Sequence, residues 1–149
     1  MKVVAYDPFL TEERAVEMGV EKADLETLLS KADFITLHTP LTDQTRGLIN
    51  KDALSKMKKT AFLINTSRGG LLVEQDVREA LDAGVIAGAA VDVLSTEPPK
   101  ADNPLVGAKN IVITPHIAWA TTEARTRLLE IVRGNIAAWK AGNTQNRVN

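Results

Sequence analysis

Cysteine is absent from the 149-residue sequence, and histidine occurs only twice, as His38 and His116. The lack of cysteine excludes a disulfide framework and thiolate chemistry, and it is typical of a cytoplasmic protein. Two isolated histidines give no ligand pattern for a metal site. We therefore expect neither disulfides nor a metal to carry the stability or the chemistry of this chain.

Excess charge and long hydrophobic runs are also missing. The net charge of −1 gives no reason to expect a nucleic acid or an anionic membrane as partner. No apolar run approaches the ~18–20 residues that span a bilayer, and residues 1–8 do not have the pattern of a signal peptide. With 44% apolar and 25% charged residues, the composition predicts one globular domain with its own core.

Strand-like and helix-like segments alternate along the chain. The predicted strands are residues 3–7, 34–40, 61–67, 86–94 and 110–116. The predicted helices are residues 11–19, 24–32, 50–59, 74–84 and 121–142. Thr11 and Asn50 are predicted N-caps, and glycines follow several helices. Largely apolar strands separated by helices predict an α/β fold, a parallel sheet with helices on both faces.

Polar residues follow the predicted strands, and ligands bind at the carboxyl ends of the strands in open α/β sheets. These residues are Asp7, His38, Thr39, Pro40, Asn65, Thr66, Ser67, Arg68, Asp92, Pro115 and His116. The irregular segment 95–109 contains Glu97, and loops of this length inside compact domains are often functional. The sequence therefore predicts a site at this edge of the sheet.

Three of these residues suit the reduction of a 2-keto acid. Arg68, in NTSRGG, could bind a carboxylate through its planar fork and polarise the substrate carbonyl, or it could be a surface residue of a turn. His116 could donate a proton to the forming alkoxide, or it could only bond to backbone. Glu97 could stabilise the charged imidazolium, or it could be a solvated loop acid. The hydride would come from a cofactor.

Two aspartates point to the identity of that cofactor. Asp7, in MKVVAYDP, could accept hydrogen bonds from both hydroxyls of an adenosine ribose. This favours NAD over NADP, whose 2′-phosphate would face a like charge. Asp92 could hold a carboxamide such as that of nicotinamide. The alternatives are an Asp-Pro turn for Asp7 and an N-cap or turn acid for Asp92.

Taken in order, the motifs resemble the NAD-binding domain of the D-isomer-specific 2-hydroxyacid dehydrogenases. They are YDP, ADFITLHTPLTDQTRGLIN, MKKTAFLINTSRGGLLVEQDVREAL, GAAVDVLSTEPP, NPL and NIVITPHIAWAT. STEPPKADNPL followed by HIAWAT is most similar to the glycerate dehydrogenase (hydroxypyruvate reductase) branch. The resemblance implies a Rossmann-like doubly wound sheet and the reversible NAD-dependent reduction of hydroxypyruvate, glyoxylate or a similar acid.

The resemblance also implies roles for single residues. It assigns substrate binding to Arg68, acid/base catalysis to His116 and the tuning carboxylate to Glu97. Trp119 would border the substrate or simply pack. The residues predicted to contact the cofactor are Asp7, His38, Thr39, Pro40, Asn65, Thr66, Asp92 and His116.

The sequence departs from the family pattern at its front. It contains no G-x-G-x-x-G turn, which in the family holds the pyrophosphate at a helix N-terminus after the first strand. We therefore expect residues 1–149 to be a partial NAD-binding domain that lacks the first βα unit and the preceding substrate segment. Such a fragment should be inactive alone, and an uncapped sheet edge should favour a homo-oligomer such as a dimer.

Two alternatives to this function remain. One is a non-enzymatic module on the same fold, like the corepressors of this superfamily that sense NAD. The other is hydride transfer of the formate dehydrogenase type, which needs no proton donor. Glu97 argues against the second alternative, because that variant pairs its histidine with glutamine.

Overall fold

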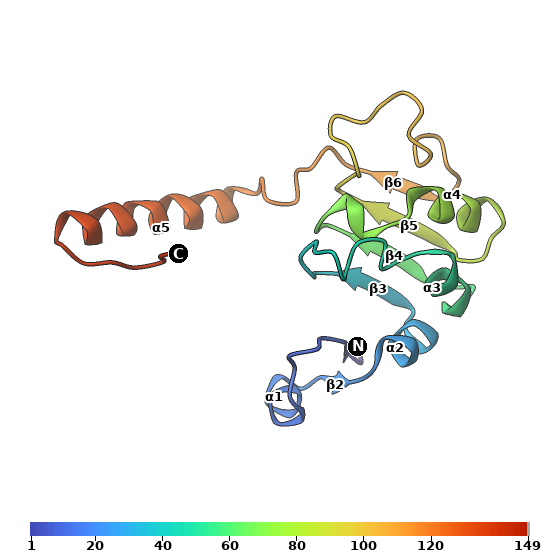
Figure 1. Cartoon of the computed structure of the whole chain (residues 1–149), viewed down its shortest axis with the longest axis horizontal. Helices are drawn as coiled ribbons and strands as arrows, with labels where there is room; N and C mark the ends of the chain where they lie inside the picture. Colours follow the sequence, from blue (N-terminus) through green and yellow to red (C-terminus); the bar gives the residue numbers. More distant parts are fainter. Residues whose placement is uncertain (149) are drawn as a thin grey trace. The chain divides into compact units, whose positions relative to one another are not determined.

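A computed structural model describes residues 1–148 of the chain (Figure 1). The elements are β1 (Val4–Ala5), α1 (Glu12–Met18), β2 (Glu21–Lys22), α2 (Leu25–Lys31), β3 (Phe34–Leu37), α3 (Lys51–Lys56), β4 (Phe62–Asn65), a 3-10 turn (Gly69–Leu71), α4 (Glu74–Asp82), β5 (Gly88–Val91), β6 (Ile111–Ile113) and α5 (Thr122–Lys140). The chain divides into two compact units, Met1–Pro115 and His116–Asn149, and each unit is described by itself.

All strand pairs in the first unit are parallel, which confirms the predicted α/β fold. One sheet has four strands in the order β3-β4-β5-β6, and β1 pairs with β2 in a separate two-stranded sheet. The sequence predicts five strands, and β2 is not among them. Its two residues, Glu21 and Lys22, are both charged, so they give no apolar pattern that could indicate a strand.

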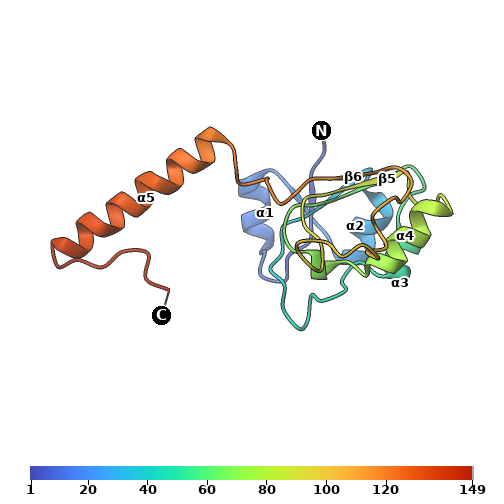
Figure 2. The ribbon, with the colours of Figure 1, turned by 90° about the horizontal axis from the view of Figure 1, so that it is seen from above.

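The hydrophobic core lies on one face of the four-stranded sheet. Figure 2 shows α2, α3 and α4 together on that side of the sheet. The strands turn alternate residues toward these helices because successive side chains of a strand point to opposite faces. The buried strand residues are Ile35, Leu37, Leu63, Ala89 and Val91, and the helices contribute Leu29, Ala53, Leu54, Val77, Ala80 and Leu81.

The opposite face of this sheet carries exposed apolar side chains. Phe34 and Val112 are each 62% exposed and Phe62 is 42% exposed. The rings of Phe34 and Phe62 stack, with their centroids 5.6 Å apart. The sequence predicted helices on both faces, but α2, α3 and α4 form a layer on one face only.

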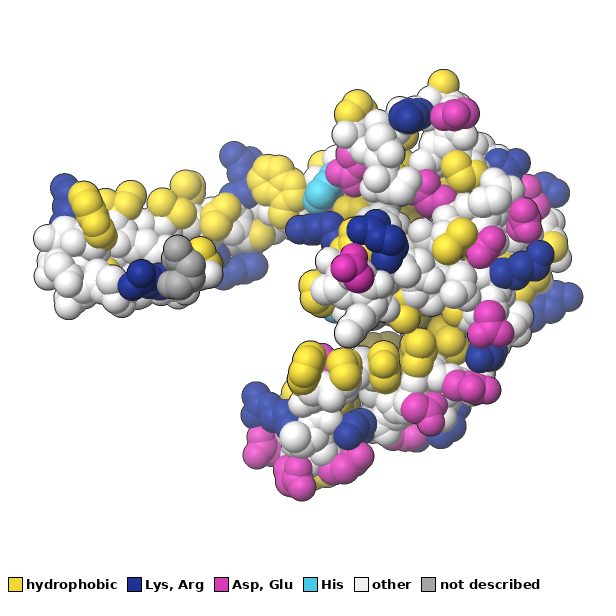
Figure 3. All heavy atoms as spheres, viewed as in Figure 1, with side chains coloured by type: hydrophobic (Ala, Val, Ile, Leu, Met, Phe, Trp, Pro, Cys, Tyr) yellow, Lys and Arg dark blue, Asp and Glu magenta, His cyan; other side chains and the backbone are white. Residues whose placement is uncertain are grey.

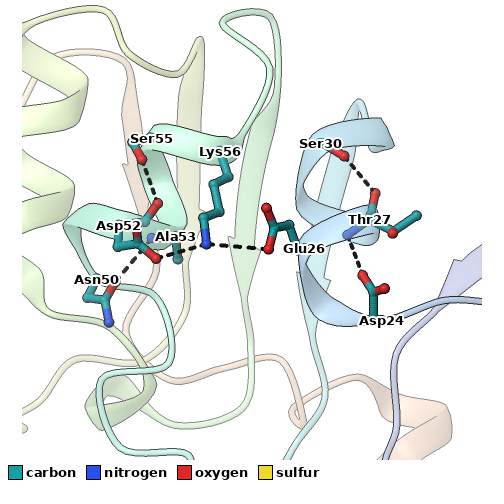
Figure 4. Close-up of polar contacts among 9 residues, drawn as sticks. All are labelled: Asp24, Glu26, Thr27, Ser30, Asn50, Asp52, Ala53, Ser55 and Lys56. Atoms are coloured by element: carbon teal, nitrogen blue, oxygen red, sulfur yellow. Dashed lines mark hydrogen bonds and ion pairs between the residues drawn. The ribbon is translucent and has the colours of Figure 1, made fainter.

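Polar side chains begin the helices where the sequence predicted. Thr11 and Asn50 each accept a hydrogen bond from the amide three residues further on, at 3.2 and 3.1 Å. Asp24 does the same for α2 at 2.7 Å (Figure 4). Each bond satisfies an N–H group that the helix itself leaves unpaired. Both predicted N-caps are therefore confirmed.

One lysine lies between α2 and α3. The ammonium of Lys56 is 3.0 Å from Asp52 in its own helix and 3.8 Å from Glu26 in α2 (Figure 4). The Asp52 carboxylate, followed by Glu26, raises the pKa of Lys56. Exposed ion pairs of this kind contribute about 0–1 kcal/mol each, so apolar packing is the main support of the helical layer.

The second unit contains α5, which begins after the N-cap Thr121. Helix α5 (Thr122–Lys140) has no buried residue. Figure 3 shows hydrophobic side chains along this helix. They include Leu128, Leu129, Ile131, Val132, Ile136 and Trp139. Across residues 1–148, no helix combines the length and apolar character needed to cross a membrane.

Candidate functional site

The strands of the main sheet end together, which places the predicted polar residues along one edge. Leu37 pairs with Asn65, Asn65 with Val91, and Val91 with Ile113. Each of these four residues is the last of its strand. The segments that begin with His38, Thr66, Asp92 and Thr114 therefore all leave the sheet at its carboxyl edge, as the sequence predicted.

Asn65 is fully buried and shapes the turn that carries Arg68. Its Nδ2 donates to the carbonyl oxygen of Arg68 at 2.9 Å, and its Oδ1 accepts from the amide of Ser67 at 3.0 Å. The Ser67 hydroxyl donates to the carbonyl of Leu37 at 2.8 Å, which ties the turn to the neighbouring strand. Asn65 was predicted to contact the cofactor, but its amide is directed into this turn.

Arg68 itself is exposed at the end of this fixed turn. Its Nη1 donates to the carbonyl oxygen of Ser67 at 2.7 Å. Among the described residues, no carboxylate forms an ion pair with Arg68. The guanidinium can therefore bind an incoming carboxylate through two parallel hydrogen bonds.

Asp92 is buried at the same edge, directly after β5. It is 5% exposed and accepts a hydrogen bond from the hydroxyl of Thr114, the first residue after β6. Its own amide donates to the carbonyl of Asn65 at 2.9 Å. Asp92 thus joins the ends of three strands, and its carboxylate lies among polar groups of the edge.

Glu97 lies in the long loop between β5 and β6, where it turns back onto the chain before it. Its Oε1 accepts from the amide of Leu94 at 3.0 Å. Gly69 packs against the same stretch, since a Cβ on Gly69 would lie 1.9 Å from the carbonyl carbon of Leu94 and 2.3 Å from the nitrogen of Ser95. The structure therefore brings the turn of Arg68 and the loop of Glu97 together at one place.

A residue that the sequence analysis passed over holds this loop. Glu74, the first residue of α4, is 9% exposed. Its carboxylate accepts from the amide and the hydroxyl of Ser95, both at 2.7 Å, and from Nδ2 of Asn103 at 2.9 Å. Nothing local in the sequence could have shown this, because an acid in a first helical turn is typical of an exposed position.

The remaining predicted residues of this edge lie closer to solvent. His38 is exposed, and its Nε2 is 3.0 Å from the hydroxyl of Thr36. Thr39 is half-buried, whereas Pro40 and Thr66 are exposed. They follow the ends of β3 and β4, where a ligand on the sheet edge could contact them.

Asp7 lines a separate hollow beside the two-stranded sheet. The hollow has a volume of about 480 Å³. It is lined by Tyr6, Asp7, Pro8, Glu12, Glu21, Lys22, Ala23, Asp24 and Thr27. Oδ1 of Asp7 accepts from the amide of Phe9 at 2.7 Å, which leaves the second oxygen for a ligand. Four carboxylates and one ammonium make this hollow predominantly acidic.

Glu21 gives this hollow part of its negative charge. The Glu21 carboxylate lies 2.5 Å from the ammonium of Lys2 and 3.2 Å from that of Lys31. The hydrogen bond from Lys2, followed by that from Lys31, lowers the pKa of Glu21. Glu21 therefore stays charged at neutral pH.

His116 and Trp119 belong to the second unit. His116 is exposed and has a φ of 55°, in the left-handed region that few residues other than glycine adopt. The indole nitrogen of Trp119 donates to the His116 carbonyl at 2.8 Å, and the Trp119 side chain is otherwise 59% exposed. Trp119 therefore supports the backbone that presents the imidazole.

Known proteins resemble this chain in sequence and in fold. The family model of the D-isomer specific 2-hydroxyacid dehydrogenase NAD binding domain matches residues 1–118. The chain belongs to this family. The match includes every predicted site residue except Trp119. The branch indicated by the sequence is also supported, because the chain is 47% identical to the hydroxypyruvate reductase of Blautia hydrogenotrophica over 149 residues.

Solved structures of relatives have the same fold. The NAD⁺-bound D-lactate dehydrogenase of Lactobacillus jensenii has a TM-score of 0.86 at 34% identity, over 99% of this chain and 48% of that one. An acyclic imino acid reductase bound to NADPH and D-Arg has the same TM-score at 33% identity, over 100% of this chain and 46% of that one. The match to the Blautia reductase covers 100% of this chain and 46% of that protein. The chain therefore spans about half the length of these relatives.

This family membership confirms an NAD-binding domain of Rossmann type. Among residues 1–148, no group of three histidine or acidic side chains could hold a metal ion. In the first unit, the guanidinium of Arg68 at the sheet edge suits the binding of an anion.

Proposed function

We propose that this chain is part of an NAD-dependent D-2-hydroxyacid dehydrogenase that reduces hydroxypyruvate or glyoxylate reversibly. One observation carries the proposal. An exposed Arg68, on a turn fixed by buried Asn65, packs through Gly69 against the loop that carries Glu97. His116 is the third residue after β6 of the same sheet. The order and spacing of these residues match the motif pattern of the family.

Three charged or titratable side chains carry out the proposed reaction. Arg68 binds the substrate carboxylate and turns the carbonyl toward the cofactor, and its charge also stabilises the oxygen that becomes an alkoxide. A bound nicotinamide cofactor would supply the hydride for the carbonyl carbon. His116 donates the proton that the alkoxide oxygen takes up, and Glu97 stabilises the charged imidazolium before that transfer.

The acidic hollow around Asp7 supports NAD over NADP. The free oxygen of Asp7 can accept from a ribose hydroxyl, as the family pattern suggests. Glu12, Glu21 and Asp24 line the same hollow with Lys22 as its one lining cation, while Lys2 and Lys31 pair with Glu21. A 2′-phosphate placed there would be repelled, so the hollow favours the cofactor without it.

We also propose that residues 1–149 have no enzymatic activity alone. We propose further that the protein is cytoplasmic and that it forms a homo-oligomer such as a dimer. The exposed stacked pair Phe34 and Phe62 supports association, because exposed apolar groups on a sheet face favour contact with another surface. Sedimentation should show an oligomer, and a monomer that persists at high concentration would contradict this. NADH oxidation with hydroxypyruvate should be negligible for the chain alone.

A chimera tests the function directly. The chain would replace the matching 149 residues of the Blautia reductase, which supplies the rest of the enzyme. The chimera should oxidise NADH with hydroxypyruvate. Arg68→Ala should raise KM for the keto acid about 10–100-fold, as expected for the loss of hydrogen bonds to a charged group. His116→Ala should reduce kcat.

Arg14→Ala is the matched control for the Arg68 variant. Arg14 is an exposed arginine of α1 that pairs with Glu17. Its loss should leave both kinetic constants unchanged. A folded chimera without activity, or one in which Arg68→Ala and Arg14→Ala behave alike, would overturn the proposed function.

A further inference from the structure

Glu74, the first residue of α4, is a buried acid whose carboxylate binds a loop. Glu74 is the one acidic side chain besides Asp92 that is buried among the described residues. All its hydrogen bonds go to the loop between β5 and β6, at Ser95 and Asn103. A buried carboxylate needs such donors, because burial without them is strongly unfavourable.

One of the three donors, the Asn103 amide, is fixed from its own side. Oδ1 of Asn103 accepts from the amide of Leu105 at 2.9 Å, and Leu105 is fully buried in the core. This bond sets the orientation of the Asn103 amide, so Nδ2 faces Glu74. Four residues further along α4, Arg78 donates to the carbonyl of Pro104 at 2.9 Å. Helix α4 therefore forms hydrogen bonds with both ends of the segment 95–104.

The segment 95–104 contains Glu97. The Ser95 amide that Glu74 binds adjoins Leu94, whose amide donates to Oε1 of Glu97. Gly69, next to Arg68, packs against the same Leu94–Ser95 backbone. A shift of Ser95 would therefore move Glu97 and loosen the contact with the turn of Arg68.

We propose that Glu74 is a positioning residue: with Ser95 and Asn103 it forms a buried clamp that fixes Glu97 beside the turn of Arg68. This rests on the proposed function in so far as Glu97 serves the proton donor. The clamp acts only by holding the loop, and Glu74 contacts neither substrate nor cofactor. Its chemistry requires an acceptor at position 74 and donors at positions 95 and 103.

The clamp can be tested in the 149-residue chain by exchanging the hydrogen-bond acceptor at position 74 with the donor at position 103. Glu74→Gln places an NH₂ group against the NH₂ group of Asn103, and Asn103→Asp alone places two carboxylates together. The double variant Glu74→Gln/Asn103→Asp lets the new amide donate to the new carboxylate. Each single variant should therefore loosen the loop, and the double variant should restore much of its order.

Two measurements report the state of this loop. Hydrogen exchange of the Ser95 amide should be about tenfold faster or more in each single variant, and slower again in the double variant. Trypsin should cut after exposed Lys100 faster in the single variants. Glu79→Gln, an exposed acid of the same helix, is the control and should leave both rates unchanged. Equal rates in all five proteins would overturn the clamp.

The chimera then tests whether the clamp serves catalysis. Glu74→Gln should lower kcat about tenfold with little change of KM for hydroxypyruvate, because Arg68 keeps its carboxylate contact. Asn103→Asp should restore much of kcat in the Glu74→Gln background. A loosened loop with unchanged kcat would overturn the positioning role. If the unsubstituted chimera is inactive, the proposed function fails, while the exchange rates of the chain still decide the clamp.

Discussion

Gly69 lies so close to the backbone of Leu94 that a methyl group on Gly69 would be 1.9 Å from the Leu94 carbonyl carbon and 2.1 Å from its oxygen. This contact joins the turn of Arg68 to the loop of Glu97. A side chain of any size would separate the two segments, because backbone atoms cannot rotate away as the end of a side chain can. The glycine after Arg68 is therefore required for packing.

We expect Gly69→Ala to destabilise the first unit by about 1–3 kcal/mol, the usual range for inserting a carbon into a packed site. Hydrogen exchange of the β4 and β5 amides would measure the loss. Gly134→Ala is the control, since a Cβ there meets only the end of Gln145, at 3.3 Å. In the interior of α5, alanine should be neutral or stabilising. Equal effects of both changes would contradict the packing argument.

Asn65→Asp should also destabilise the first unit. It keeps the acceptor for Ser67 but replaces the donor to the Arg68 carbonyl with a second acceptor, at a fully buried position. A loss of about 1–3 kcal/mol is expected for the unsatisfied group, together with a higher KM for the keto acid in the chimera. Urea unfolding followed by circular dichroism would measure the stability.

Asn135→Asp is the matched control for this change. The side chain of Asn135 in α5 uses its oxygen as an acceptor for Gln145 and Asn146. Aspartate preserves both bonds, so its effect on stability should be small. A comparable loss at Asn65 and Asn135 would mean that the buried donor to Arg68 is unimportant.

Asp7→Asn should weaken the preference for NADH over NADPH in the chimera. The asparagine oxygen can still accept from the Phe9 amide, and the change removes one of the negative charges around the hollow. The ratio of kcat/KM for the two cofactors should fall roughly tenfold, which corresponds to the repulsion of two nearby charges at a partly exposed site. Asp43→Asn, outside the hollow, should leave the ratio unchanged. An unaltered ratio in the Asp7 variant would count against ribose binding there.

The start of α2 should lose stability in acid. The hydrogen bond from the Thr27 amide, followed by that from its hydroxyl, lowers the pKa of Asp24. A carboxyl whose pKa is lower in the folded state stabilises that state at higher pH. Its contribution falls as the pH drops from the ordinary carboxyl pKa through the lowered one. Hydrogen exchange of the first amides of α2, measured against pH, would show this.

Asp24→Asn provides the comparison for that titration. The asparagine oxygen still caps the helix but does not titrate in this range. Exchange at the start of α2 should therefore depend less on pH in the variant than in the unsubstituted chain. Identical pH profiles would show that the charge of Asp24 has no part in the cap.

Much of the fold could be predicted from the sequence because its signals are local. Thr11 and Asn50 cap helices as predicted, and the strands pair in parallel as expected. The short charged strand β2 was missed because it is defined only by its pairing with β1. The exposed face of the main sheet was also missed, because an apolar strand residue does not reveal whether a helix covers it.

The sequence by itself determined the parallel α/β fold, the edge at which the polar residues gather and the family. These follow from strand and helix periods and from motif order, which are properties of neighbouring residues. Only the tertiary structure decided that Asn65 turns its amide into the turn of Arg68, and that Glu74 binds Ser95 and Asn103. A buried polar group takes its partners from whatever the fold brings within hydrogen-bonding distance. The partners of Glu74 lie 21 and 29 residues away in the chain.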